Sequence, residues 1–205
     1  MTSKEKDNMA DSTLNGLVLA GGKSTRMGRD KGAINWHGKE QRYFMADLLG
    51  QFCQDVYISC RPEQVDEISH IYKALPDSYP GLGPYGGILT AFQFRPDIAW
   101  LVIACDLPLI NENTLQFLIL HRDISCIATT FRSPHDQFPE PLITIWEPQS
   151  LPELLEFMNK GVKCPRKVLI NSHIKLLDPP VPHDLMNVNK PEELEEAKKL
   201  LNQNL

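Results

Sequence analysis

The chain has 205 residues, with 21 Lys and Arg against 26 Asp and Glu, which gives a formal net charge of −5. This length and ordinary composition suit one globular domain that can bury a core without disulfides or a structural metal. The acidic balance argues against a nucleic-acid-binding protein, because such binding relies on Lys and Arg that neutralise phosphates. It does not exclude a small phosphate-rich ligand, which needs only a local basic site.

No apolar run approaches the roughly 20 residues that a membrane-spanning helix requires. Residues 1–13 are polar and charged, so we expect a flexible tail there rather than a signal peptide, and a single domain over residues 14–205. The five cysteines contain no Cys-x-x-Cys pair, which favours reduced thiols over a disulfide framework or a zinc site. These features predict a cytoplasmic protein without membrane contact.

Short apolar runs alternate with stretches of helical spacing along the whole chain. We expect strands at residues 16–20, 55–59, 71–75, 99–105, 124–130, 142–146 and 174–177. We expect helices at residues 43–52, 88–92, 115–119, 151–158 and 191–201, with the proline-rich stretches 133–141 and 178–182 as loops. This alternation predicts a three-layer α/β/α fold with a mostly parallel, twisted, Rossmann-like sheet. A ligand site is then expected in the loops that follow the first four strands, after Ala20, Ser59, Leu75 and Cys105.

The segment that follows the first expected strand combines glycines with basic residues. Gly21 and Gly22 have no side chains, so a ligand's oxygens can approach the backbone N–H groups closely. Four basic residues then fall within the segment 23–31: Lys23, Arg26, Arg29 and Lys31. Backbone donors together with Arg and Lys are the chemistry of polyphosphate binding. A solvated basic turn is the alternative interpretation.

Two familiar phosphate-binding motifs fit the chain poorly. A P-loop needs a glycine five residues before Gly22, and that position is Leu17. Residues 81–86 match Gly-x-Gly-x-x-Gly, but Pro84 interrupts the match and a separate loop divides it from the strand expected at 71–75. A P-loop and a dinucleotide-binding site are therefore both disfavoured.

Five blocks of the chain resemble a known family, in the family's order. Residues 19–31 read Leu-x-Gly-Gly-x-Ser-x-Arg-Met-Gly-x-Asp-Lys, which is similar to the N-terminal signature of the molybdenum cofactor guanylyltransferases. The other blocks are Gly-Pro-Tyr-Gly-Gly-Ile at 83–88, Cys-Asp-Leu-Pro at 105–108, Glu-Pro-Leu at 140–142 and Asn-Val-Asn-Lys-Pro-Glu-Glu-Leu at 187–194. The resemblance implies a nucleoside-triphosphate transferase that moves GMP from GTP to molybdopterin, giving the guanine dinucleotide form and pyrophosphate.

The resemblance also implies the residues of the site. The nucleotide would lie along the backbone of the first strand's end and against two later loops: Leu19, Ala20, Gly21, Gly22, Ser59 and Asp77. From their charge, we expect Lys31 and Arg26 to contact the phosphates and to take part in catalysis by stabilising the transferring group. The resemblance implies that Asp106 contacts the nucleotide, binds Mg²⁺ and takes part in catalysis. By their polarity and their position in late loops, the candidates for binding the molybdenum cofactor are Arg132, Arg166, Asn187 and Asn189. Delivery of that cofactor implies meetings with other cofactor-biosynthesis proteins.

Several alternatives stay open at this point. Asp77 and Asp106 also suit turns or a helix cap, because Pro76 and Pro108 lie beside them. The chain departs from the family pattern at Ser59 (commonly Asn), at residues 85–86 (usually Leu-Ala) and at residue 190 (Lys for Thr). The function could instead be a related transfer from CTP or to another phosphorylated acceptor, or nucleotide binding by a regulator without turnover.

Overall fold

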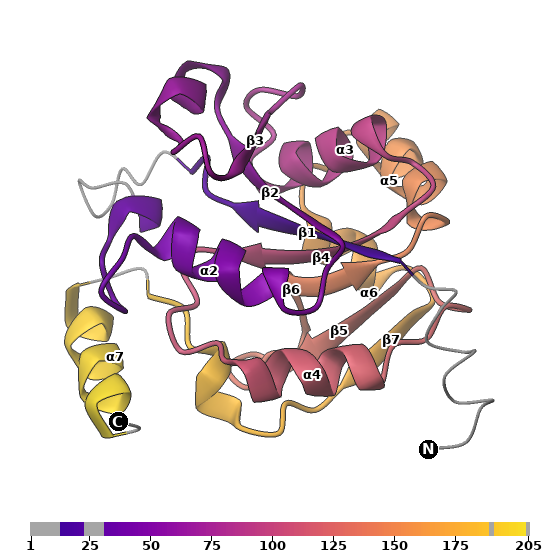
Figure 1. Ribbon diagram of the computed structural model, residues 1–205. Coiled ribbons are helices and arrows are strands. Elements are labelled where there is room, and N and C mark those ends of the chain that lie inside the picture. The colour runs from indigo at the N-terminus through magenta and orange to yellow at the C-terminus, as the bar shows by residue number, and fades with distance from the viewer. Residues whose placement is uncertain (1–12, 23–30, 189–190, 204–205) are drawn as a thin grey trace, which may run out of the picture.

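The computed structural model describes residues 13–22, 31–188 and 191–203. Within these residues the chain forms a seven-stranded sheet with helices on both faces (Figure 1). The strands are β1 (Leu14–Leu19), β2 (Asp55–Cys60), β3 (Lys73–Pro76), β4 (Ala99–Ala104), β5 (Ala128–Arg132), β6 (Pro139–Trp146) and β7 (Ile174–Leu177). The α-helices are α2 (Gln41–Gly50), α3 (Pro84–Phe94), α4 (Glu112–Leu120), α5 (Ser150–Asn159), α6 (Pro165–Ile170) and α7 (Pro191–Gln203). Three short 3-10 helices complete the set: η1 (Lys31–Ala33), η2 (Pro62–Glu67) and η3 (Pro182–Leu185).

The strand order is β3-β2-β1-β4-β6-β5-β7. β1 pairs in parallel with both β2 and β4, and β2 with β3 and β5 with β7 are also parallel pairs. β6 alone among these strands runs antiparallel to its neighbours, β4 and β5. The start of β6 therefore lies at the edge where the other strands end.

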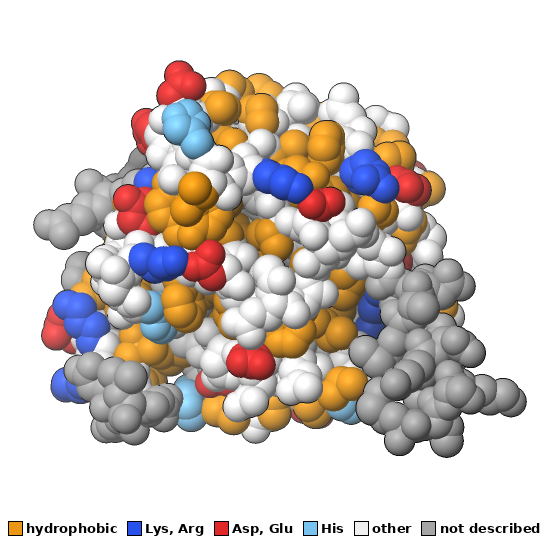
Figure 2. Space-filling model, viewed as in Figure 1, with side chains coloured by type: hydrophobic (Ala, Val, Ile, Leu, Met, Phe, Trp, Pro, Cys, Tyr) orange, Lys and Arg blue, Asp and Glu red, His pale blue; other side chains and the backbone are white. Residues whose placement is uncertain are grey.

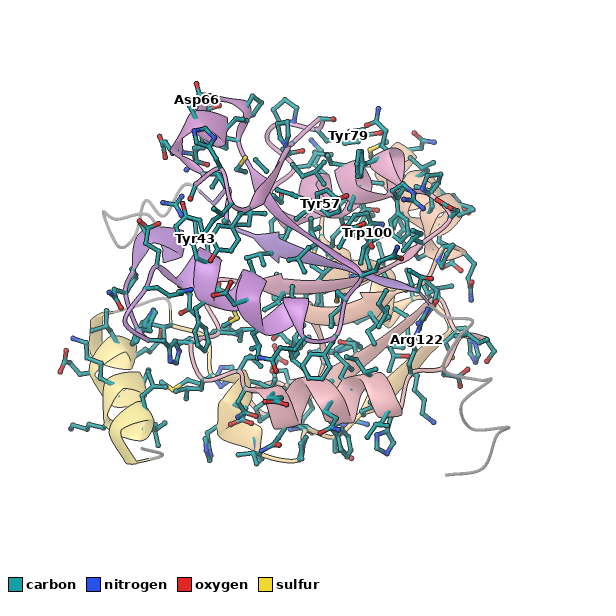
Figure 3. The ribbon with its side chains drawn as sticks, viewed as in Figure 1. Tyr43, Tyr57, Asp66, Tyr79, Trp100 and Arg122 are labelled. Carbon is teal, nitrogen blue, oxygen red and sulfur yellow. The ribbon has the colours of Figure 1, made fainter. Side chains whose placement is uncertain are left out.

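Two apolar clusters, one on each face of the sheet, form the main core. Successive residues of a strand point to opposite faces, so Val18 belongs to the cluster under α2 and α4, and Leu17 to the cluster under α3, α5 and α6. Every residue of β4 is buried, as expected for a central strand covered on both faces. Trp100 of β4 pairs with Trp146 of β6, and its ring meets that of Tyr57 edge-on with 5.7 Å between the centroids (Figure 3).

The C-terminal helix α7 packs beside the sheet rather than on either face (Figure 1). Ala197 of α7 is fully buried and forms a small cluster with Leu109 and Val188. Leu109 follows β4 and Val188 precedes α7. The helix therefore packs against the loop that follows β4.

The predicted three-layer fold and mostly parallel sheet are confirmed, with local corrections. The strand expected at 71–75 begins at Lys73, and Ile71 is 82 % exposed. The strand expected at 124–130 begins at Ala128, because the Asp123 carboxylate and carbonyl accept hydrogen bonds that form a turn before it. The stretch 133–141, expected to be a loop, already belongs to β6 from Pro139, where proline is tolerated as the first residue of a strand. Helix α6 was not expected.

Candidate active site

A cavity of about 580 Å³ opens at the edge where the parallel strands end. Its walls include the end of β2 and the loops after β1, β3 and β4, where the sequence predicts the site residues Gly21, Gly22, Ser59, Asp77 and Asp106. Arg61, directly after β2, also lines it. Leu142 of β6 also lines it, because the antiparallel strand brings its first half to this edge. Gly83 and Pro84 add the start of α3 to the wall.

Hydrogen bonds between backbone groups hold these loops together beyond the ends of the strands. They run from Cys105 N–H to Leu19 O (3.4 Å), from Ala20 N–H to Ser59 O (3.0 Å) and from Asp77 N–H to Cys60 O (2.9 Å). The cavity wall is therefore a continuation of the sheet. The buried Cys60 thiol, whose pKa is raised by burial, stays protonated in this wall near neutral pH.

The glycines in the block at residues 83–88, where α3 begins, let this helix approach the site closely. A Cβ on Gly87 would lie 2.7 Å from a Leu19 methyl group and 2.8 Å from the Ser59 hydroxyl. A Cβ on Gly86 would lie 2.6 Å from the Tyr79 carbonyl and 2.9 Å from an Asp77 carboxylate oxygen. The preceding residue of the block, Tyr85, is fully buried, and its hydroxyl donates to the Leu154 carbonyl at 2.6 Å. Burial raises its pKa to about 12.

Asp77 lines the cavity and also organises the loop that follows β3. Its Oδ1 accepts hydrogen bonds from the Tyr79 N–H at 2.8 Å and from the Thr90 hydroxyl of α3 at 3.1 Å. The turn-forming role considered for Asp77 is thus confirmed. Contact between Asp77 and a nucleotide stays a prediction.

Asp106 lies two residues beyond β4, in the cavity wall, where it meets the segment before α7. Its carbonyl accepts a hydrogen bond from the Val188 N–H at 2.8 Å. This bond brings Asn187 alongside Asp106, although the two are far apart in the sequence. The Asn187 Oδ1 is buried and accepts no hydrogen bond within the described part of the chain. A carboxylate and an unsatisfied amide oxygen are the kinds of donor that suit a hard cation such as Mg²⁺.

This donor set is small. The described residues contain no group of three or more His, Cys, Asp and Glu that could hold a metal. Mg²⁺ commonly binds through one or two protein oxygens, with water and substrate phosphates as its other ligands. The residues present therefore fit a cation that binds together with a triphosphate.

A partly buried ion pair lies near Asp106. The Glu140 side chain is 3 % exposed and its Oε2 is 3.1 Å from Nη2 of Arg166, whose Nη1 is 2.6 Å from Asp136. Burial raises the pKa of Glu140, and the negative charge of Asp106 raises it further. Arg166, a candidate for acceptor binding, therefore lies on the Asp106 side of the sheet edge. Arg132, another of these candidates, pairs with Asp178 at 2.9 Å.

Some of the predicted residues cannot be placed. Arg26 and Asn189 lie outside the described residues. Lys31 begins η1, and the neighbouring Gly32 lines the cavity. One cavity residue, Arg61, was missed by the sequence analysis. A basic residue directly after the second strand, where ligands bind in such sheets, was the available signal.

The remaining surface shows no concentration of one sign of charge on the face seen in Figure 2, where basic and acidic side chains lie next to one another. In the part of the chain that the structure describes, every helix is too short or too polar to cross a bilayer.

Residues 16–175 match the model of the MobA-like NTP transferase domain. The chain is 37 % identical to the molybdenum cofactor biosynthesis bifunctional protein of Synechocystis, covering 92 % of this chain but only 54 % of that protein. It is 31 % identical to the probable molybdenum cofactor guanylyltransferase of Nostoc, covering 88 % of each chain. In fold it resembles molybdopterin-guanine dinucleotide biosynthesis protein A from Archaeoglobus fulgidus, with a TM-score of 0.75, 20 % identity, and 93 % and 100 % of the two chains covered. The chain therefore belongs to the family of MobA-like NTP transferases.

Proposed function

We propose that this protein transfers GMP from GTP to the terminal phosphate of a molybdopterin-type acceptor. The observation that carries the proposal is the cavity itself, which brings Gly21, Gly22 and Asp106 to one sheet edge. The names of the Synechocystis and Nostoc relatives support the acceptor and the guanine nucleotide.

The reaction needs positioning and charge neutralisation rather than a protein base. A phosphate oxygen of the acceptor attacks the α-phosphorus of GTP, and the bond from that phosphorus to the oxygen bridging the α- and β-phosphates breaks. Pyrophosphate leaves with the electron pair of that bond. Because the nucleophile is already an anion, no proton has to be removed. Backbone N–H groups of Gly21 and Gly22 and the side chains of Lys31 and Arg26 hold the phosphates in line.

Asp106 and Asn187 are the residues that would hold Mg²⁺. When bound, the cation would neutralise charge on the phosphates as the pyrophosphate leaves. Asn187 and Asn189 are the candidates for binding the acceptor, together with Arg166, whose partner Glu140 lies near Asp106. The five cysteines are free thiols, which supports a reducing compartment and hence the cytoplasm. The acceptor would be received from, and passed to, other proteins of cofactor biosynthesis.

The test is incubation of the purified protein with molybdopterin, MgCl₂ and either GTP or CTP, followed by measurement of pyrophosphate and of the dinucleotide product. GTP should give both products. D106N should slow the reaction by at least about 100-fold, the loss expected when charge stabilisation is removed from a transfer site. D97N is the matched control, because Asp97 is exposed and pairs only with Arg95 among the ion pairs found. Use of CTP without use of GTP would contradict the proposal.

A further inference from the structure

Arg61 is a basic residue in the cavity wall to which the proposed chemistry assigns no role. It follows β2, and its side chain is 29 % exposed. Its Nη1 donates a hydrogen bond to the Gly21 carbonyl at 2.8 Å, and its Nε donates to Glu63 of η2 at 2.9 Å. The planar guanidinium is thus held between the loop after β1 and the short helix after β2.

The hydrogen bond from the Arg61 side chain to the Gly21 carbonyl continues the row of backbone hydrogen bonds that joins the end of β1 to the end of β2. That row ends where the Ala20 N–H donates to the Ser59 carbonyl. Gly21 is the next residue, and the Arg61 side chain takes the place of a backbone donor to its carbonyl. A Cβ on Gly21 would lie 3.3 Å from the backbone nitrogen of Arg61, so the backbones after β1 and β2 run in contact at this point. Arg61 therefore fixes the peptide that joins Gly21 to Gly22.

The orientation of this peptide decides where the Gly22 N–H points. In a planar trans peptide the N–H points opposite to the carbonyl, so fixing the Gly21 carbonyl also fixes the Gly22 N–H. A Cβ built on Gly22 would have no described atom within 4 Å, and Gly22 lines the cavity. Among the described residues, none therefore crowds Gly22 where it lines the cavity. Backbone N–H groups that point into such a cavity bind anionic oxygens.

We propose that Arg61 is a positioning residue that, by holding the Gly21 carbonyl, presents the Gly22 N–H to a β- or γ-phosphate oxygen of the bound nucleoside triphosphate. The inference rests on the proposed function, because it requires a nucleotide in the cavity. Arg61 itself contacts the protein, not the ligand. Because the Gly22 N–H serves a β- or γ-phosphate, loss of Arg61 weakens the binding of nucleotides that carry these phosphates and spares those that lack them.

The first experiment measures the Kd of GTP and of GMP by calorimetry for the wild type, R61M and R95M. R61M removes the donors and keeps an apolar side chain of similar length. We expect it to weaken GTP binding about tenfold, the size of effect typical of a hydrogen bond to a charged group, and to leave GMP binding nearly unchanged. R95M is the matched control, because Arg95 pairs with Asp97 two residues on, as Arg61 does with Glu63, but at the far end of α3.

The second experiment separates positioning from direct contact. In ¹⁵N–¹H spectra, GTP should shift the Gly22 amide resonance of the wild type and of R95M, and this shift should be lost in R61M. R61K keeps a donor and should recover part of both the shift and the affinity. The KM for the acceptor should stay the same in all variants.

Three results would overturn the inference. An unchanged Kd for GTP in R61M would show that Arg61 has no role, and an equal loss for GTP and GMP would mean that Arg61 contacts the nucleoside. A Gly22 shift that persists in R61M despite weaker binding would mean that Arg61 touches the phosphates directly. Failure of the proposed function would look different: the wild type would bind GTP as described and still form no dinucleotide.

Discussion

At the scale of single residues, the site depends on places where a side chain would not fit. Gly86 is the sharpest case, because a Cβ there would meet the Tyr79 backbone carbonyl at 2.6 Å and the Asp77 carboxylate at 2.9 Å. Tyr79 lies next to α3 in Figure 3. A backbone atom cannot swing aside as a flexible side chain can. The absence of a side chain at Gly86 therefore allows this loop to pack closely on α3.

G86A should destabilise the protein by about 1–3 kcal/mol, the cost of overpacking a tight site, and should weaken GTP binding because Asp77 must move. A chain of this size would lose roughly 2–4 °C of Tm for each kcal/mol. The measurement is thermal unfolding with and without GTP. G50A is the control, since nothing lies within 4 Å of a Cβ on Gly50 at the end of α2. Equal Tm values for G86A and G50A would show that the loop after β3 moves to admit the added methyl group without loss of stability.

At the scale of elements, the start of α4 is held by the Asn111 side chain, which forms hydrogen bonds with both Thr114 and Asp184. The Asn111 Oδ1 accepts from the Thr114 N–H at 3.1 Å and caps the helix, while its Nδ2 donates to the Asp184 carboxylate at 2.9 Å. Asp184 belongs to η3 and is 3 % exposed. One amide thus connects α4 to the segment that leads to Asn187.

N111A should cost about 1 kcal/mol for the lost cap and a further 1–3 kcal/mol for the donor removed from the buried Asp184. Urea unfolding would measure the loss. N111D should keep the cap but place a second carboxylate near Asp184, so it should also be destabilised. N159A is the matched control on the exposed end of α5 and should be nearly neutral. An N111D variant as stable as the wild type would contradict the role given to Asp184.

At the scale of the whole molecule, the candidate metal site depends on how α7 docks. Ala197 of α7, Val188 and Leu109 form one small cluster, and the Val188 N–H bonds to the Asp106 carbonyl. The packing of the C-terminal helix therefore determines whether Asn187 stays beside Asp106.

A197D places a charge in this apolar contact, which costs several kcal/mol unless the helix undocks. We expect α7 to separate and GMP transfer to fall by about tenfold or more, with a higher Mg²⁺ concentration needed for half-maximal rate. Steady-state assays across a Mg²⁺ titration would measure both. K199D puts the same residue on the exposed face of α7 and should keep the wild-type profile. Wild-type Mg²⁺ dependence in A197D would separate α7 from the metal site.

Much of the architecture followed from local pattern. A short apolar run such as that of β4 predicts a buried strand whatever its neighbours in the fold. The alternation of such runs with helices predicts a parallel sheet. Because parallel strands end at one edge, the loops after Ala20, Ser59, Leu75 and Cys105 could be assigned to one cavity in advance.

The alternation of strands and helices and the basic composition of residues 21–31 follow from the sequence alone, since these depend on residues close together in the chain. Only the tertiary structure decided the direction of β6, because an apolar run is buried equally well in either direction. It also decided which distant groups meet, such as Asn187 beside Asp106 and Arg61 on the Gly21 carbonyl. Such contacts depend on how whole layers pack, and no local pattern encodes that packing.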